Sequence, residues 1–500
     1  MESTVDRFLE PRRQASIAIV IILIKFLRGS VKAFWPIALS FFIGGNDRDT
    51  WEGYLAIFLI GISILNLGGS VLTYFRYFIQ IKDDAVIIDK GILKRSKTNI
   101  PFERIQSVNF KQNLIHQFFG VVSIEIDTAG ASKAELTIDA LDKDDADIFR
   151  DQIMQAKSRM QTVEASKAVE VDEKSQDKII LHLSVPDLFK IGLSQNHLRS
   201  MAILVGFSFT ILNDINENFN GVVEDELTGF TDFISNSQWL IFLIFTLAIF
   251  IISFAYSLVM TTLRDFDLKL SLNKKGLKLI KGLLNREEIS INKNKIQIIS
   301  WSDNPLRRLF KMWTLGLEQA SSDEASKLKS RIKVPGCYIE QIERVVSNVF
   351  PESKGAISSH HKVSILLKYR LLFFVSTLPF LISLLSIYKL DWQALWLTLW
   401  PILSGIYIEL YYRKRSFDIN SETFQNNKGA FGKKKELTQI HKIQAIEITQ
   451  SWYQRRKNLA NLHVFTAAGS IRVPFISIEK ALALEKYVLY RVETDTREWM

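Results

Sequence analysis

A short motif occurs three times in this chain of 500 residues. Each copy is a Lys-Gly pair, then twelve residues of varied type, then a basic residue followed by Ile and Gln. The copies are Lys90-Gly91 with Arg104-Ile105-Gln106, Lys281-Gly282 with Lys295-Ile296-Gln297, and Lys428-Gly429 with Lys442-Ile443-Gln444. A spacing kept at this fidelity indicates one structural module used three times.

Short segments in which apolar and polar residues alternate surround each motif. In the first copy they are 79–81, 85–89, 105–110, 121–127 and 135–138. Their length and the turn residues between them predict an antiparallel sheet rather than βαβ units. A helix-like segment closes each copy, at 143–160, 338–350 and 477–492. We therefore expect three small antiparallel β-barrels or sandwiches, each with about five to seven strands and a C-terminal helix.

The motif residues have a structural explanation that needs no ligand. Gly after a strand supplies the positive φ of a hairpin, and Lys before it suits a solvated turn. The Ile of each basic-Ile-Gln triplet is expected to point into the core while its neighbours point outward. We therefore interpret the motif as a turn and a buried strand, in preference to a binding role.

Long apolar stretches alternate with the motif copies. The strongest are 53–75 and 239–263, which reach the roughly 20 residues that a helix needs to cross a bilayer. Segment 371–387 is a third good candidate. Three shorter runs accompany them, at 33–45, 198–212 and 394–408. A short run is also compatible with a buried core helix, but the regular pairing predicts one transmembrane helical hairpin before each domain.

These patterns divide the chain into alternating membrane and domain segments. An amphipathic N-terminal segment and the first hairpin cover residues 1–76, and the later hairpins with their linkers cover 161–265 and 351–412. The three globular domains cover 77–160, 266–350 and 413–495. Residues 15–29 fit either an interfacial amphipathic helix or the start of one long, tilted span, and both interpretations remain open.

Charge predicts the orientation in the membrane. The net charge is +10, and most of the 63 Lys and Arg residues lie in the motif segments. The link 213–238 contains neither Lys nor Arg, and the link 46–52 contains one Arg. By the positive-inside rule, the domains and both termini are cytosolic and the short links face outward.

The Lys-Gly turn, the basic-Ile-Gln triplet and the Thr128-Ala129-Gly130 strand end, preceded by membrane pairs, resemble a known family. It is the bacterial pleckstrin-homology-like domain of YdbS-like and YdbT-like membrane proteins, and the three-copy layout is typical of the YdbT-like ones. The middle copy departs from the pattern at Lys311, where the first copy has Gly120. The resemblance implies a multi-pass protein of the bacterial cytoplasmic membrane. Our hypothesis is a non-enzymatic scaffold for another membrane protein of the same family.

Basic clusters favour an alternative, the sensing of anionic phospholipid headgroups. Near an anionic leaflet each Lys or Arg contributes about 1 kcal/mol of attraction, although a basic cytoplasmic face is also what topology demands. The candidate residues for lipid or partner binding are Lys94, Arg95, Lys97, Arg307, Arg308, Lys433, Lys434, Lys435, Arg455 and Arg456.

Other functions find little support in the sequence. Nucleotide-binding, nucleophile-elbow and zinc-protease motifs do not occur, so we expect no enzyme activity and no cofactor. Cys337 is the single cysteine, and the pair His360-His361 lies in a polar stretch read as a linker, so no metal site is expected. The basic residues are mixed with acids, which does not favour nucleic-acid binding. A subunit of a membrane transport system ranks third.

Overall fold

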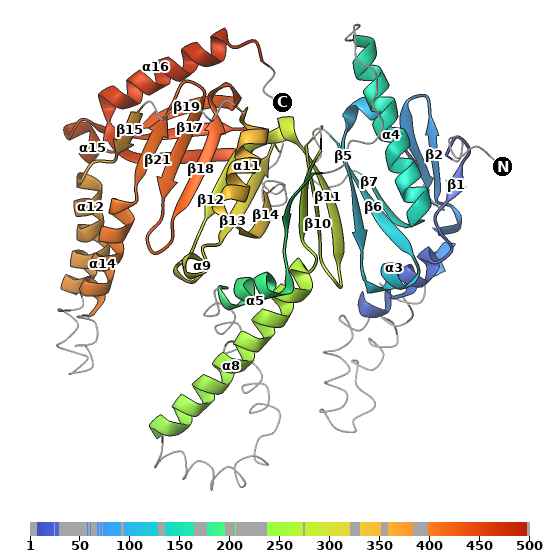
Figure 1. Ribbon diagram of the computed structural model, residues 1–500, viewed down its shortest axis with the longest axis horizontal. Coiled ribbons are helices and arrows are strands. Elements are labelled where there is room, and N and C mark those ends of the chain that lie inside the picture. The colour runs from blue at the N-terminus through green and yellow to red at the C-terminus, as the bar shows by residue number, and fades with distance from the viewer. Residues whose placement is uncertain are drawn as a thin grey trace.

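Three β-sandwich units lie in a row, and helices α8 (Gln238–Asp265) and α14 (Leu399–Arg413) leave them on one side (Figure 1). The structure is a computed structural model of the chain. It describes residues 8–24, 26–29, 74–91, 95–128, 136–164, 178–195, 238–273, 276–320, 331–351, 359–382 and 399–497, and the single positions 58, 61, 68, 69, 71, 72, 206 and 384.

Seven described strands and one closing helix build each unit. The first unit has β1 (Arg12–Arg13), β2 (Phe78–Lys82), β3 (Ala85–Lys90), β4 (Ser96–Pro101), β5 (Ile105–Gln112), β6 (Val121–Thr128), β7 (Leu136–Asp142) and α4 (Lys143–Glu164). The second has β8 (Lys178–His182), β9 (Lys269–Asn273), β10 (Gly276–Lys281), β11 (Arg286–Asn292), β12 (Ile296–Ser302), β13 (Trp313–Gln319), β14 (Arg331–Cys337) and α11 (Ile339–Val349). The third has β15 (Ser359–Lys362), β16 (Ser416–Ile419), β17 (Thr423–Lys428), β18 (Lys434–Gln439), β19 (Ile443–Thr449), β20 (Leu459–Thr466), β21 (Gly469–Ser477) and α16 (Ile478–Thr494).

Each unit folds as a four-stranded and a three-stranded antiparallel sheet that enclose its own apolar core. The antiparallel fold and the closing helices predicted from the sequence are confirmed. One strand comes from an unexpected place, because β8 lies within residues 161–265, in front of the apolar segments, and pairs with β9. β1 and β15 occupy the same position in the other two units, beside β2 and β16. His360 therefore lies in a strand and not in a linker.

The motif takes the same conformation in all three units. Gly91, Gly282 and Gly429 have φ of 107°, 101° and 137°, which confirms the expected left-handed turn. The three motif Ile residues are buried, as expected. Each is followed by a bulge in its strand, between the motif Ile and the residue two places on. The strand that begins at the motif therefore has one shape in every unit.

Short helices interrupt each three-stranded sheet after its first strand. They are α3 (Leu114–Phe118), α9 (Pro305–Leu309) and α15 (Trp452–Arg456). Each begins at a side-chain cap, Asn113, Asn304 or Ser451, which accepts a hydrogen bond from a backbone N–H of the first turn. The turn that follows contains a residue in the left-handed region, and Lys311, with φ of 56°, replaces the Gly120 of the first unit.

One helix in the described part of the chain is long and apolar enough to cross a membrane. It is the segment Leu247–Asp265 of α8, which agrees with the predicted span 239–263, and 11% of it is buried within the protein. In the third predicted hairpin, α12 (Leu366–Leu371) continues through a π-helical turn, η4 (Leu372–Thr377), that packs beside α14. Trp400 Nε1 donates to the Val375 carbonyl across this pair at 2.8 Å.

The arrangement as three hairpins stays a prediction. The apolar run 33–45 and most of the runs 53–75 and 198–212 lie outside the described residues. At the N-terminus, residues 18–24 and 26–29 are helical, and Ala18 and Ile21 pack on Tyr74 and Val121.

Candidate functional site

Two strand ladders join the three domains into continuous sheets. β5 pairs with β11, which we call the first junction, and β12 pairs with β18, which we call the second junction. The three-stranded sheet of one domain thus continues into the four-stranded sheet of the next. In both junctions the residue five places after the motif Gln faces the residue five places after the motif Gly: Lys111 faces Glu287, and Ser302 faces Lys434. One interdomain geometry is therefore used twice.

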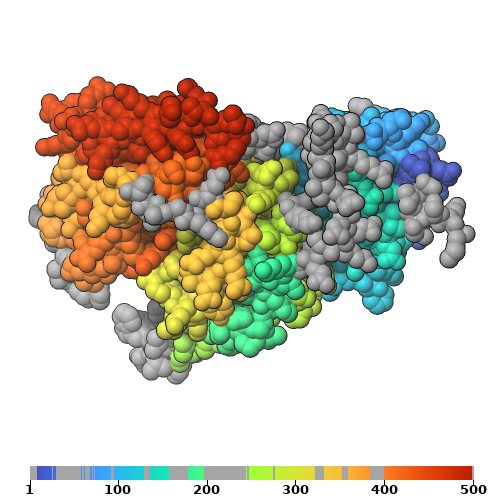
Figure 2. All heavy atoms as spheres, turned by 45° about the horizontal axis from the view of Figure 1, so that its top comes forward, coloured from blue at the N-terminus to red at the C-terminus, as the bar shows by residue number. Residues whose placement is uncertain are grey.

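Side chains cross the second junction in both directions. Ile298 on β12 is 3% exposed and belongs to the core of the third domain. Leu437 on β18 is 5% exposed and belongs to the core of the second domain. Successive residues of a strand point to opposite faces of the sheet, so a shared sheet lets each domain contribute to its neighbour's core. The second and third domains abut without a break in Figure 2 (yellow and orange).

A buried carboxylate fixes the turn at the end of the second junction. Asp303 accepts from Arg308 Nε at 2.9 Å and from Arg308 Nη2 at 3.1 Å, and it also accepts from the backbone N–H of Lys433. Its own N–H donates to the Lys433 carbonyl at 2.9 Å. Arg308 Nη2 and Lys414 Nζ both donate to the Phe431 carbonyl, at 3.3 and 3.1 Å. These contacts, which we call the turn clamp, hold the Lys-Gly turn of the third domain against α9.

Lys442, the basic residue of the third motif, is buried in the second junction. It is 5% exposed, and its Nζ donates to the carbonyls of Asn294 and Ile296 in the second domain, at 2.9 and 2.7 Å. Burial, with a smaller contribution from the charge of Lys293, lowers the pKa of Lys442 to about 8. The expectation that the neighbours of the motif Ile point outward is wrong here, and it is also wrong for the fully buried Gln297.

The first junction is more polar. Arg150 on α4 forms an ion pair with Glu288 on β11 and lies 4.5 Å from the ring centroid of Phe110. Lys278 reaches the same carboxylate at 2.8 Å. Burial alone would raise the pKa of Glu288, but Lys278 and Arg150 together lower it below its usual value. Gln117 on α3 donates to the Leu283 carbonyl at 2.9 Å, which resembles the contact of Arg308 with Phe431.

Half of the predicted basic residues lie at the second junction. Arg308 and Lys433 belong to the turn clamp. Lys434 pairs with Glu436 at 2.7 Å, and Lys435 Nζ lies 5.8 Å from the ring centroid of Trp301. Arg307 is partly buried, and its Nε donates to Ser194 Oγ at 3.4 Å. These five residues therefore have structural roles within the row of domains.

The other basic residues lie at the two ends of the row. Arg95 and Lys97 are exposed at and beside β4 of the first domain, and Arg455 is exposed on α15 of the third. These three side chains form no ion pair within the described part of the chain. Arg456 is exposed and stacks on the Trp452 ring at 4.0 Å. Lys94 lies outside the described residues. The structure does not bring the ten residues together into one patch.

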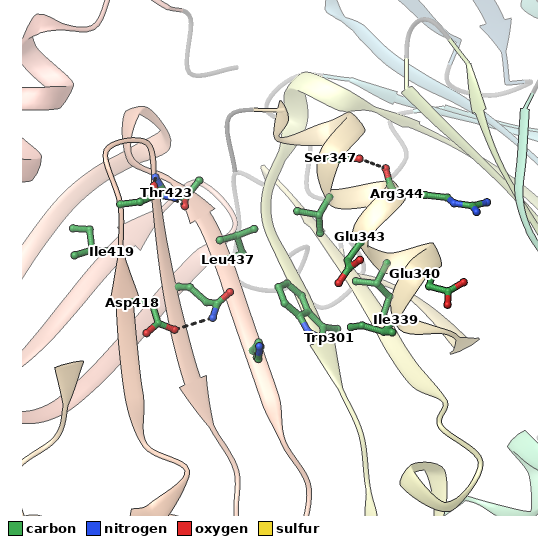
Figure 3. Close-up of a pocket in the computed structure, with 15 residues that line it drawn as sticks. Trp301, Ile339, Glu340, Glu343, Arg344, Ser347, Asp418, Ile419, Thr423 and Leu437 are labelled. Atoms are coloured by element: carbon green, nitrogen blue, oxygen red, sulfur yellow. Dashed lines mark hydrogen bonds between the residues drawn. The ribbon is translucent and has the colours of Figure 1, made fainter. Parts of the chain in front are cut away.

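A groove of about 690 Å³ lies between α11 and strands β16–β18 (Figure 3). Its apolar lining comes from both domains and includes Trp301, Ile339 and Leu437. Glu343 and Arg344 are exposed along the α11 side. An apolar floor with charged groups along one wall has the character of a site for a peptide segment or an amphipathic ligand. Sequence reasoning missed this groove, because it forms only where two domains share a sheet.

A hydrogen-bond network forms the other wall of the groove. The buried Asp418 accepts from Gln425 Nε2 at 2.9 Å and from Asn427 Nδ2 at 2.7 Å. Its second oxygen is bonded to His360 Nδ1 on β15. The network fixes the orientation of Gln425, which lines the groove. In the described ranges, His, Cys, Asp and Glu residues do not cluster in threes as a metal site would require.

Exposed apolar side chains cover the tips of the short helices. Phe118 on α3 is 83% exposed, Leu309 on α9 is 76% exposed and Trp452 on α15 is 69% exposed. Figure 1 places α3 and α9 on the side from which α8 leaves. Large apolar groups next to a membrane-spanning helix are suited to the bilayer interface.

Three tandem two-sheet sandwiches, each closed by one helix, together with a helix long and apolar enough to cross a bilayer, define a membrane protein built from repeated pleckstrin-homology-like domains. The sequence profile of the family "Bacterial PH domain" matches residues 18–157, 226–352 and 370–492, and the chain belongs to this family. The chain is also similar to the UPF0699 transmembrane protein YdbT of Bacillus subtilis (strain 168). The two are 20% identical over 473 residues, which cover 92% of this chain and 94% of the relative.

Proposed function

We propose that this protein is a non-enzymatic platform in the bacterial cytoplasmic membrane, whose three cytosolic domains bind another membrane protein, one of the same family. The observation that carries the proposal is the pair of junctions. They fix three domains in one row beside the membrane helices, and they form a groove that no single domain could provide. A platform needs such a fixed surface more than it needs a headgroup pocket, and three of the ten candidate basic residues, Arg308, Lys433 and Lys435, contact the neighbouring domain at the second junction.

The groove is the proposed docking site on this platform. Trp301 and Leu437 would contact apolar side chains of the partner, and Glu343 and Arg344 would select its charges. Because an apolar floor gives affinity and a charged rim gives specificity, a charge reversal at the rim weakens binding without disturbing either core.

Cross-linking with mass spectrometry in native membranes tests the proposal. The full chain should cross-link reproducibly to a second membrane protein through lysines near the groove, and the complex should co-purify in detergent. Glu343→Arg with Arg344→Glu should abolish this co-purification, while the matched control Arg95→Ala with Lys97→Ala should leave it unchanged. Recovery of the same partner by the groove variant would contradict the groove as the docking site, and the absence of any partner would refute the platform function.

Sensing of anionic lipid is the second candidate, and it rests on the exposed tips of α3 and α9. Apolar residues such as Phe118 and Leu309 would enter the interface, while exposed basic residues on the same side would attract the headgroups. Hydrogen exchange of the full chain in bilayers with and without anionic lipid distinguishes this role. Protection of α3 and α9 that requires anionic lipid and is lost at high salt would support it. Equal protection in neutral bilayers would exclude it.

A further inference from the structure

The row of domains ends in two unpaired strand edges of the kind that its junctions use. In the described part of the chain, β4 has β3 as its only strand neighbour and β19 has β20 as its only one. β4 corresponds to β11 and β18, because each follows the Lys-Gly turn of its domain. β19 corresponds to β5 and β12, because each begins at the motif Ile. One chain therefore carries both halves of a third junction, at opposite ends of the row.

We infer that β19 of one molecule pairs with β4 of a second copy of this chain, in the register that both internal junctions use. With the same offsets from the motif, Thr449 faces Ser96, and Glu447 faces Thr98. The pairing is head to tail, so each added copy again presents a free β4 or a free β19. This assembly goes beyond the platform function and does not depend on it.

The shape of β19 supports the inference. β19 has the same bulge after its motif Ile as β5 and β12. Its unpaired edge therefore has the same shape as the edges of β5 and β12 that pair with the next domain. Gln444, Ala445 and Glu447 are exposed along β19, and Ser96, Lys97 and Asn99 along β4. An unpaired edge exposes backbone N–H and C=O groups that another strand can satisfy, which is the basis of β-strand addition.

The basic residues at the ends of the row support it independently. Arg95 and Lys97 lie four and six residues after Gly91, as Lys433 and Lys435 lie after Gly429. The latter pair belongs to the second junction, where the backbone N–H of Lys433 donates to Asp303 and the Lys435 ammonium lies over the Trp301 ring. Arg95 and Lys97 thus occupy, at the unpaired edge of β4, the positions that Lys433 and Lys435 occupy at β18.

Arg455 matches the residues on the other side of each junction, which donate from a short helix to the Lys-Gly turn of the next domain. It is the fourth residue after its helix cap, the position of Gln117 in the first domain and of Arg308 in the second. Gln117 and Arg308 each donate to a carbonyl in the Lys-Gly turn of the next domain. Arg455 is exposed. In the assembly it donates to the corresponding end of β4 in the neighbouring copy.

The membrane permits this extension. The three domains lie in a row, and α8 and α14 leave on one side of it (Figure 1). A second copy that is placed relative to the first as neighbouring domains are placed within one chain keeps its helices on that side. A second copy is the simplest occupant of each edge, because it already carries the matching strand, bulge and basic residue.

Cysteine cross-linking of the full chain in native membranes tests the inference. Two differently tagged single variants, Thr98→Cys and Glu447→Cys, are co-expressed and treated with a short bis-maleimide. Cys337 is retained because it is buried, and the wild-type chain controls for its reaction. We expect a covalent dimer that carries both tags, and at least five-fold less dimer from Thr98→Cys alone or from Glu447→Cys alone. Arg455→Glu in the second chain should lower the yield several-fold, and the matched change Arg456→Glu by less than two-fold.

Two results would overturn the inference. Equal yields from the mixed pair and from the single variants would show contact without the head-to-tail register. An adduct of either variant with a different protein, with no adduct between copies, would show that the edges serve another partner. The second result would leave the platform function standing, since that function is judged by the groove variants. A single chain with both cysteines should also give a ladder of oligomers, and a monomer alone would count against the assembly.

Discussion

Ile298 belongs by sequence to the second domain, but it faces Thr438 across the second junction and its side chain lies in the core of the third domain. A residue placed in this way couples the stability of two domains. Ile298→Ala should therefore destabilise the third domain by about 2–5 kcal/mol, as expected for a buried Ile cut back to Ala. Hydrogen exchange of β20 amides measures the effect. Ile299→Ala is the matched control, because Ile299 lies in the core of its own domain and should affect β13 instead.

The turn clamp provides a second prediction. Asp303→Asn replaces a carboxylate that accepts from Arg308 and from the Lys433 N–H, so charge-assisted hydrogen bonds are lost. Such bonds contribute roughly 1.5–3 kcal/mol each. We expect faster proteolysis at residues 429–433 in the variant, measured on the detergent-solubilised chain. Unchanged cleavage would show that the β12–β18 ladder alone holds the turn.

The motif glycines provide a third prediction. Gly282 has φ of 101°, and an added Cβ would lie 2.0 Å from the Asn285 carbonyl oxygen, so Gly282→Ala should cost about 3 kcal/mol or more. Gly120 also has a positive φ, of 68°, but an added Cβ there would meet no atom within 4 Å. Gly120→Ala should therefore cost only about 1–2 kcal/mol. Thermal unfolding of the two variants compares the costs, and equal losses would contradict the steric argument.

Lys442 predicts a dependence of stability on pH. Its pKa in the folded protein is about 8, below the ordinary value of 10.5, so between these pH values the unfolded chain holds a proton that the folded protein lacks. Stability should therefore rise with pH through this window, and below it the cost of burying the charge is fully present. The neutral amine still donates to both carbonyls. The melting temperature of the wild type relative to Lys442→Met should increase between pH 8 and 10, and a constant difference would count against the assignment.

The proposed topology can be tested with a membrane-impermeant maleimide. A cysteine introduced at Glu224, in the acidic link 213–238, should be labelled from outside intact cells. One at the exposed Lys97 should be labelled only after lysis. Cys337 should remain unlabelled in both cases, because it is fully buried and burial raises its pKa to about 12. Labelling of the Lys97 position in intact cells would reverse the proposed orientation.

Much of the fold follows from local patterns in the sequence. The left-handed turns at Gly91, Gly282 and Gly429 were predictable, because Gly adopts that conformation readily and the motif repeats. The alternating strands and the closing helices were predictable from periodicity. The fourth strand of each domain was not: β4 reads Ser-Lys-Thr-Asn-Ile-Pro and has almost no apolar alternation. Strands β1, β8 and β15 were missed because they precede long apolar segments that dominate the pattern.

The candidate site was far less predictable than the fold. The groove and both junctions depend on pairing between strands that are distant in sequence, such as Gln112 with Arg286, and periodicity carries no information about which edges meet. Lys442 was expected to point outward, because strand alternation places the neighbours of a buried Ile on the opposite face. Its partners are two backbone carbonyls of another domain, which no side-chain motif reveals.

The shared sheets also determine how force passes along the molecule. A domain on a flexible linker can tilt with its own membrane helices while its neighbours stay still. Here a tilt of α8 or α14 would have to shear a hydrogen-bonded ladder, or move the adjoining domain as well. The protein therefore resembles a stiff beam, and bending or thinning of the bilayer around α8 would act on all three domains.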